Sequence, residues 1–459
     1  MRERVCAPER RWLTRRGRLP RPLPRSRLTP SRGKGRLAAP APPVDWLSGP
    51  WRLAAAAAAF VCGLILLATA AACSSDTSIT PPTAPPDNAT ARAQAGQRAL
   101  DAFARGLRSG QPASAVASTR STGLVPAVTA NARALGLRSL SFDYVDTDDS
   151  ALGSAGERKW GSDAWVGIVA TNYRLSADNG PTQMEIAVTF TREQGTVRIA
   201  AIGGHGHRSA LWLDGPITVR HRGAVWIIDA DSASAGRFLG YGLTAVRQVR
   251  MVLPRWHGSL VLEIPADEPQ LNSVLDADAS TYTDIAGITT TADGAQAQHS
   301  PIHVFINQAI FGSLKRRGAQ VVMTHETTHV ATKAPLTDVP TWLSEGFADY
   351  VGLDHADVPL RTAAAQIIKR VRAHGLPKRL PTSTDLAPTA EGLGATYEEA
   401  WTVCRYLGDA YGEARLVAFY QGVSGGMSLA RAFRVHFGVD QAQVVAGWRA
   451  WLGNLAGVA

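Results

Sequence analysis

The chain contains a short segment whose side chains could hold a metal ion. It reads His-Glu-Thr-Thr-His from His325 to His329, so two imidazoles lie four residues apart. On an α-helix this spacing places both imidazoles on one face, where they can bind the same ion. Neutral imidazole is a good zinc ligand, and Glu326 lies where it can reach a water molecule on that ion. The pattern therefore predicts a zinc site that activates water.

A second pair of polar residues follows close behind. Glu345 and Asp349 are four residues apart in the segment after Pro340. This spacing predicts that both carboxylates lie on one face of a second helix. We also expect Gly346, which has no side chain, to let the two helices approach each other closely.

Together the two segments resemble the gluzincin metallopeptidases. The wording "HETTHVAT" followed by "PTWLSEGFADYV" is especially similar to bacterial proteins called peptidase MA-like. The resemblance implies that His325, His329 and Glu345 bind one Zn²⁺ per chain and that Asp349 hydrogen-bonds a ligand histidine. It also implies that Glu326 is the general base, which takes a proton from water and passes it to the leaving amine.

The same resemblance implies a hydrogen-bond donor for the negatively charged oxygen that forms during peptide hydrolysis. Aminopeptidase-like gluzincins use a downstream tyrosine, and Tyr397 in "GATYEEAWTVC" is our candidate. Three other tyrosines compete for this role, and core packing is an alternative for each of them: Tyr406, Tyr411 and Tyr420. The usual strand before the zinc helix corresponds to 302–311. We expect it to be an edge strand that can pair with an extended peptide.

The surrounding segments predict an α+β protein. Apolar residues recur at helical spacing in 91–110, and alternating patterns typical of strands then occur at 137–146, 163–176 and 183–204. A helix followed by antiparallel strands resembles the nuclear-transport-factor-like or cystatin-like domains. From residue 216 onward, strands and then helices predict a zincin-like metallopeptidase domain with a mixed sheet and a mostly helical C-terminal part.

The positive charge of the chain belongs to its N-terminal leader. The first 72 residues hold 14 of the 48 basic residues and three of the 38 acidic ones, which gives them a net charge of +11. The remainder has a net charge of −1. This nearly neutral remainder, which we call the body, offers no electrostatic reason to bind nucleic acid, so we expect no nucleic-acid partner.

An apolar run of 20 residues at 53–72 follows Arg52 and precedes Cys73. This is typical of a secretory signal, and Ala-Ala-Ala-Cys at 70–73 is similar to a bacterial lipobox in which Cys73 would be lipidated. Ordinary cleavage after Ala72 and an uncleaved single span are alternatives. All three place the body outside the cytoplasm and attach it to the cell membrane or release it there.

The predicted organisation is a basic disordered leader, a signal or anchor, a Pro/Ser/Thr-rich tether, an α+β accessory domain and a gluzincin-like domain, at 1–52, 53–73, 74–90, 91–215 and 216–459. The sequence thus predicts an exported, membrane-tethered zinc metallopeptidase that acts on peptides or proteins. The alternative is a zinc-containing surface lipoprotein that binds peptide or cell-envelope material without cleaving it.

Overall fold

The computed structural model describes residues 88–458 except 149, 232 and 388–389. The predicted leader, the signal segment with its lipidation residue Cys73, and the tether as far as residue 87 lie outside the described residues. The first helix begins at Asn88, so it includes the last three residues of the predicted tether, 88–90. Within the described residues, no helix is both long and apolar enough to cross a membrane.

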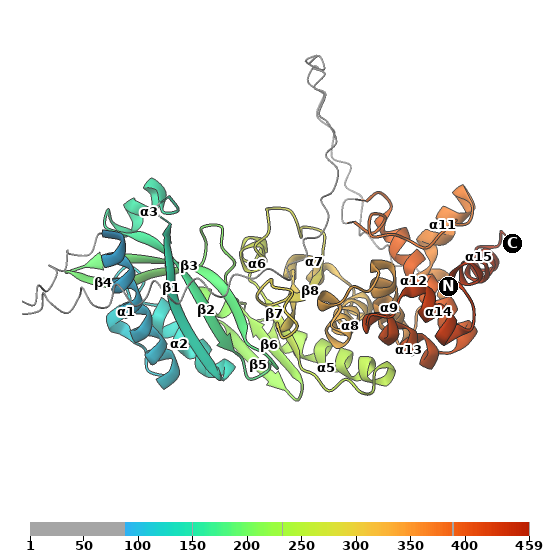
Figure 1. Cartoon of the computed structure of the whole chain (residues 1–459), viewed down its shortest axis with the longest axis horizontal. Coiled ribbons are helices and arrows are strands. Elements are labelled where there is room, and N and C mark those ends of the chain that lie inside the picture. The colour runs from blue at the N-terminus through green and yellow to red at the C-terminus, as the bar shows by residue number, and fades with distance from the viewer. Residues whose placement is uncertain (1–87, 149, 232, 388–389, 459) are drawn as a thin grey trace, which may run out of the picture. The chain divides into compact units, whose positions relative to one another are not determined.

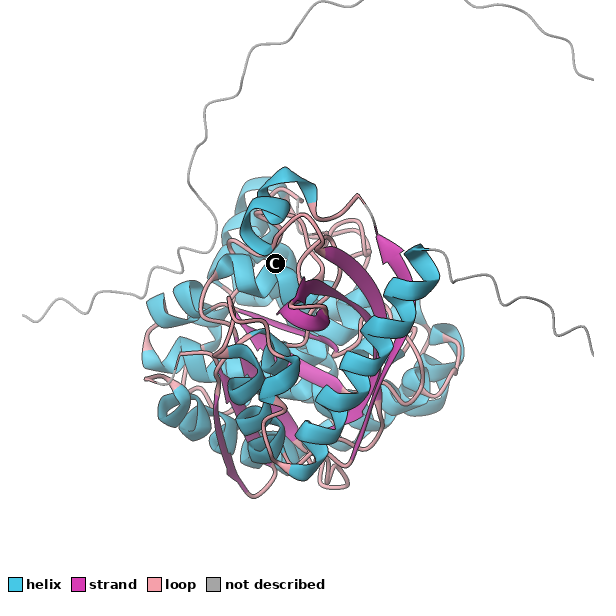
Figure 2. Ribbon diagram, turned by 90° about the vertical axis from the view of Figure 1, so that its left-hand side faces the viewer, coloured by secondary structure: helices cyan, strands magenta, loops and turns pink. Residues whose placement is uncertain are grey.

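The N-terminal part consists of a four-stranded antiparallel meander with helices against it (Figure 1). Helix α1 buries Leu100, Phe103, Ala104 and Leu107, the residues whose spacing predicted it. Figure 2, which views this end of the molecule, shows helices lying in front of the strands. The elements are α1 (Asn88–Ser109), α2 (Leu124–Leu135), β1 (Ser139–Asp148), α3 (Gly153–Trp160), β2 (Trp165–Arg174), β3 (Thr182–Glu193), β4 (Thr196–Ile202) and α4 (Leu211–Asp214).

A second sheet of five strands follows, in the order β5-β6-β7-β9-β8. Strands β6, β7 and β9 are parallel, whereas β5 and β8 run antiparallel to their neighbours, so the sheet is mixed as predicted. Helix α5 joins β6 to β7 and packs closely on the sheet at Gly242, where a Cβ atom would lie 2.7 Å from Val225. The elements are β5 (Thr218–Arg222), β6 (Val225–Asp229), α5 (Ala235–Val252), β7 (Leu260–Ile264), α6 (Glu268–Leu275), β8 (Gly287–Thr291) and β9 (Ile302–Ile306).

The C-terminal part is helical (Figure 1). Its core contains Phe347, Phe419, Phe433 and Trp448, all fully buried. The helices are α7 (Gln308–Ser313), α8 (Arg316–Thr332), α9 (Thr341–Asp354), α10 (Leu360–Ala363), α11 (Ala365–His374), α12 (Leu393–Tyr411), α13 (Glu413–Ser424), α14 (Leu429–Phe437) and α15 (Gln441–Ala456). Cys404 lies buried on α12 among these apolar side chains.

Two expectations about the second sheet are wrong. Segment 302–311 is not one strand, because β9 ends at Ile306 and the side chain of Asn307 caps helix α7. Nor is β9 at the edge, since it lies between β7 and β8. The edge strand next to β9 is β8, whose Gly-Ile-Thr-Thr-Thr sequence has one apolar side chain and therefore too weak a pattern to predict a strand.

Candidate metal centre

Helix α8 carries the first part of the site. It packs on the sheet through Ala319, Met323 and Val330, which belong to the same apolar cluster as Val304 and Ile306 of β9. The two threonines between the histidines are also buried, although threonine does not favour a helix. Their hydroxyls donate hydrogen bonds to carbonyl oxygens four residues earlier, at 2.7 Å for Thr327 and 2.8 Å for Thr328. These bonds pair the buried hydroxyls, and the packing against the sheet holds the motif helical.

The structure brings the three predicted ligands to one point. The Nε2 atoms of His325 and His329 lie 3.0 Å apart. An oxygen of Glu345, on helix α9, lies 3.3 Å from Nε2 of His325 and 3.5 Å from Nε2 of His329. Among the residues that the structure describes, these three form the one group of histidine, cysteine or acidic side chains that could hold a metal ion.

These separations fit zinc. Ligand atoms about 2.0–2.1 Å from a tetrahedral ion lie about 3.3 Å from one another, close to the three observed separations. Two imidazole nitrogens and one carboxylate oxygen are also the donor set of a catalytic zinc centre, which leaves a fourth position for water or substrate. Residues His325, His329 and Glu345 would therefore hold the ion.

Asp349 fixes the orientation of one ligand. Its carboxylate accepts a hydrogen bond from Nδ1 of His325 at 2.9 Å, so the ring must present Nε2 to the ion. Burial disfavours the charged imidazole, but Asp349 and Glu345 outweigh this and hold the pKa of His325 well above its ordinary value without a metal. Burial likewise opposes the charge on Glu345, yet the two histidines keep the pKa of its carboxyl well below the usual range.

The close approach of helices depends on two glycines of α9, and not in the way the sequence suggested. Gly346 faces α12 and not α8, because a Cβ atom on it would lie 2.4 Å from the carbonyl oxygen of Ala400. Gly352 faces α8, where a Cβ atom would lie 3.0 Å from the carbonyl oxygen of Val321. Helix α9 is thus held between α8 and α12 (Figure 1), and each contact uses its own glycine.

Glu326 is buried beside the ligands, with 8% of its surface exposed. Its carboxylate accepts a hydrogen bond from the hydroxyl of Thr289 on the edge strand β8, at 2.6 Å. Sequence reasoning missed Thr289, because nothing in the weak pattern of β8 connects it with α8. It also missed Ser344, whose hydroxyl lies 3.5 Å from Nδ1 of His329 and whose position next to Glu345 could have drawn notice.

Tyr397 lies on α12 near the ligands. Burial raises the pKa of its hydroxyl, and the negative charges of Glu345, Asp349 and Glu326 raise it further. Two of the other tyrosines are engaged with each other. The rings of Tyr406 and Tyr411 contact each other.

Tyr420 is almost fully buried and packs against Phe347 at a distance of 4.6 Å between ring centres. Of the four candidate tyrosines, Tyr397 is the one whose hydroxyl senses the charges of Glu326, Glu345 and Asp349 together. The role of Tyr397 as the donor to the oxyanion stays a prediction.

A second buried charge cluster lies away from the histidine pair. Nδ1 of His303, on β9, lies 2.6 Å from a carboxylate oxygen of Glu263 on β7, and Nε2 lies 3.1 Å from Asp178 in the loop between β2 and β3. Burial lowers the pKa of His303, but the two carboxylates outweigh it and raise the pKa to about 10. This cluster joins the N-terminal meander to the second sheet.

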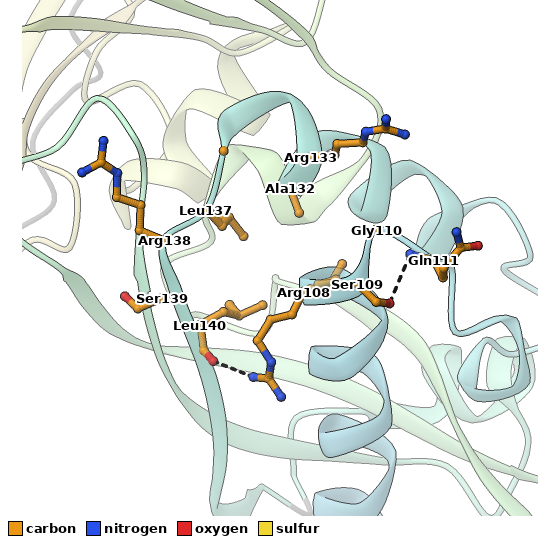
Figure 3. Close-up of a pocket in the computed structure, with 12 residues that line it drawn as sticks. Arg108, Ser109, Gly110, Gln111, Ala132, Arg133, Leu137, Arg138, Ser139 and Leu140 are labelled. Atoms are coloured by element: carbon orange, nitrogen blue, oxygen red, sulfur yellow. Dashed lines mark hydrogen bonds between the residues drawn. The ribbon is translucent and has the colours of Figure 1, made fainter.

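A hollow of about 430 Å³ lies between the ends of α1 and α2 and the start of β1 (Figure 3). Its lining residues belong to the N-terminal part and include none of the predicted zinc ligands. Three arginines line it, but in Figure 3 Arg133 and Arg138 point away from each other. Arg108 donates a hydrogen bond to the carbonyl oxygen of Leu140 at 3.0 Å. Arg108 and Arg133 lie in the last turns of their helices, where a positive charge is favourable without any ligand.

Comparison with known proteins agrees with the motif. Residues 294–454 match the family model described as the Peptidase MA superfamily. This part of the chain, which contains every predicted ligand, is therefore similar to the Peptidase MA superfamily, and the resemblance predicted from the sequence is confirmed. No protein with a curated description matches the chain.

One solved structure that resembles the chain is a mutant of an M1 zinc metallopeptidase from Deinococcus radiodurans, bound to a Tyr-Ser-Ala substrate. The TM-score is 0.32 and the sequence identity is 12%. The match covers 62% of this chain and 61% of the length of that protein.

Proposed function

We propose that this protein is a zinc-dependent metallopeptidase. The observation that carries the proposal is the convergence of His325, His329 and Glu345 at 3.0–3.5 Å, with Glu326 beside them on the same helix. Three ligands leave a fourth position open, which is the arrangement of a catalytic zinc centre and not of a structural one. The match of 294–454 to the Peptidase MA superfamily supports a peptide or protein as the substrate.

The side chains around the ligands divide the work of hydrolysis. Zinc, when bound, would supply Lewis acidity toward a substrate carbonyl and a water molecule. Glu326 would take a proton from the water and give it to the leaving amine. Asp349 holds His325 in the tautomer that leaves Nε2 free to bind the ion. Tyr397 would donate a hydrogen bond to the carbonyl oxygen as it becomes negatively charged.

The edge strand β8 offers a place for the substrate backbone. At the two ends of β8, the N–H group of Ala292 donates to the carbonyl oxygen of Pro301, and the carbonyl oxygen of Ala286 accepts from the N–H group of Asn307. In an antiparallel pair every second residue faces its partner, so Gly287 and Thr289 direct their backbone groups to the free edge. An extended peptide paired there would lie beside Glu326, which contacts Thr289.

The proposal is tested by metal content and by one substitution. We expect about one zinc per chain in the purified body, and less than about 0.2 would contradict the zinc site. Glu326→Gln should keep the zinc and abolish cleavage of a mixed peptide library, whereas Glu157→Gln, an exposed change on α3, should alter neither. Zinc binding with no cleavage by the wild type would instead favour the alternative, a lipoprotein that binds peptide or cell-envelope material.

We also propose that the body is exported and held at the cell membrane through lipidated Cys73. The apolar run before Cys73 and the Pro-rich stretch after it support this location. Cys73→Ala should move the protein from the membrane fraction to the soluble extracytoplasmic fraction. Mass spectrometry of the mature N-terminus would distinguish lipidation from plain cleavage after Ala72 and from an uncleaved span.

A further inference from the structure

The contact between the edge strand β8 and the carboxylate of Glu326 has no counterpart in the sequence motif. Thr289 Oγ1 lies 2.6 Å from Oε2 of Glu326 and 3.2 Å from the main-chain oxygen of the same residue. The hydroxyl has one proton, and the shorter contact to a charged acceptor is the stronger one. Thr289 therefore donates its hydrogen bond to the carboxylate.

Gly287, the neighbouring position on the same face of the strand, leaves space for the same carboxylate. Residues two apart on a strand point to the same side, so the positions of Gly287 and Thr289 both face helix α8. A Cβ atom on Gly287 would lie 3.0 Å from Cγ of Glu326 and 3.4 Å from its Oε1. The carboxylate thus fits against a bare stretch of backbone on one side and a hydroxyl on the other.

The two oxygens of Glu326 consequently have different surroundings. Oε2 accepts the hydrogen bond from Thr289, whereas no described residue donates a hydrogen bond to Oε1. A carboxylate fixed through one oxygen in a buried position keeps the other in a constant direction. That free oxygen is the one available to take a proton.

We propose that Thr289 is a positioning residue that orients the general base of this site. That Glu326 is a general base rests on the proposed function. That Thr289 orients its carboxylate rests on the 2.6 Å contact. Thr289 also directs its backbone groups to the free edge, so a peptide paired with β8 would lie beside the base that this residue orients.

The test compares Thr289→Val, which keeps the shape but removes the hydroxyl, with Thr289→Ser, which keeps the hydroxyl. Thr290→Val is the matched control, because its side chain lies on the opposite face of the same strand. A hydrogen bond to a charged group contributes about 1.5–3 kcal/mol, so kcat of T289V should fall about 10- to 150-fold. KM and zinc content should stay near the wild-type values, and T289S should regain most of kcat.

Crystal structures of the zinc-loaded variants give a readout that does not depend on activity. The Glu326 carboxylate should keep its single orientation in the wild type and T289S and should turn or occupy several positions in T289V. An unchanged carboxylate in T289V, or a loss of kcat shared equally by T290V, would overturn the inference. A wild type that binds zinc but cleaves nothing would overturn the proposed function, while the orientation of the carboxylate would still decide the role of Thr289.

Discussion

Replacement of Gly346 by alanine tests how the second zinc-site helix is held in place. A Cβ atom at this position would lie 2.4 Å from the carbonyl oxygen of Ala400 and 3.1 Å from Sγ of Cys404. The oxygen belongs to the backbone of α12 and cannot rotate away. Helices α9 and α12 would have to separate by about 1 Å to restore ordinary van der Waals contact.

The expected effect on stability follows from that clash. Overpacking of a tight core contact costs about 1–3 kcal/mol, and it outweighs the gain of up to about 1 kcal/mol that alanine has over glycine in a helix. Each kcal/mol lost from the free energy of unfolding lowers the melting temperature by about 2–4 °C in a domain of about 150–250 residues. Because Glu345 is the adjacent residue, we also expect zinc affinity to fall.

Scanning calorimetry and competition for zinc with a chelator would measure the two effects. Gly240→Ala is the control, because a Cβ atom there meets nothing within 4 Å, and this variant should melt at or slightly above the wild type. Gly352→Ala should lie between the two, since its nearest contact is 3.0 Å. If G346A melts no lower than G240A and binds zinc as tightly as the wild type, the packing argument is wrong.

Three further changes test the site and its support. Replacing Asp349 by asparagine removes the acceptor of Nδ1 of His325 and should weaken zinc binding about 10- to 100-fold in a chelator titration. Tyr397→Phe should lower kcat about 100- to 1000-fold through loss of the oxyanion donor, whereas Tyr411→Phe should leave kcat unchanged in the same assay. The pKa of His303, raised to about 10 in the folded state, exceeds the value of about 6.5 in the unfolded chain. The stability that His303 contributes is therefore complete below pH 6.5 and is lost as the pH rises toward 10. We expect the melting temperature of the zinc-loaded protein to fall over that range. The fall should be smaller in the variant His303→Gln.

Local spacing was enough to predict a shared ion for His325 and His329, and the resemblance to the gluzincins implied Glu345 as the third ligand. Two histidines four residues apart must lie on one face if the segment is helical, and the same holds for Glu345 and Asp349. The periodicity of long segments likewise predicted helix α1 and the meander, because a half-buried strand or helix repeats its apolar residues at a fixed interval. The predicted domain boundaries and the likeness of the meander to nuclear-transport-factor-like or cystatin-like domains stay predictions.

Contacts between distant segments were not available from spacing. The sequence suggested that Gly346 faces the zinc helix, but the rotation of α9 about its axis turns Gly346 toward α12 and Gly352 toward α8. Likewise, the position of β9 inside the sheet depends on β8, a strand that carries little apolar pattern. Which strand is at the edge is a property of the whole sheet and not of any one segment.

The sequence by itself therefore determined the chemistry of this protein's candidate site: which side chains could bind zinc and which carboxylate could act as base. Only the tertiary structure decided that Thr289 meets Glu326 and that His303 lies between Glu263 and Asp178. The physical reason is that a helix or strand repeat fixes the relative directions of neighbouring residues. Contacts between elements depend on how every element packs against all the others.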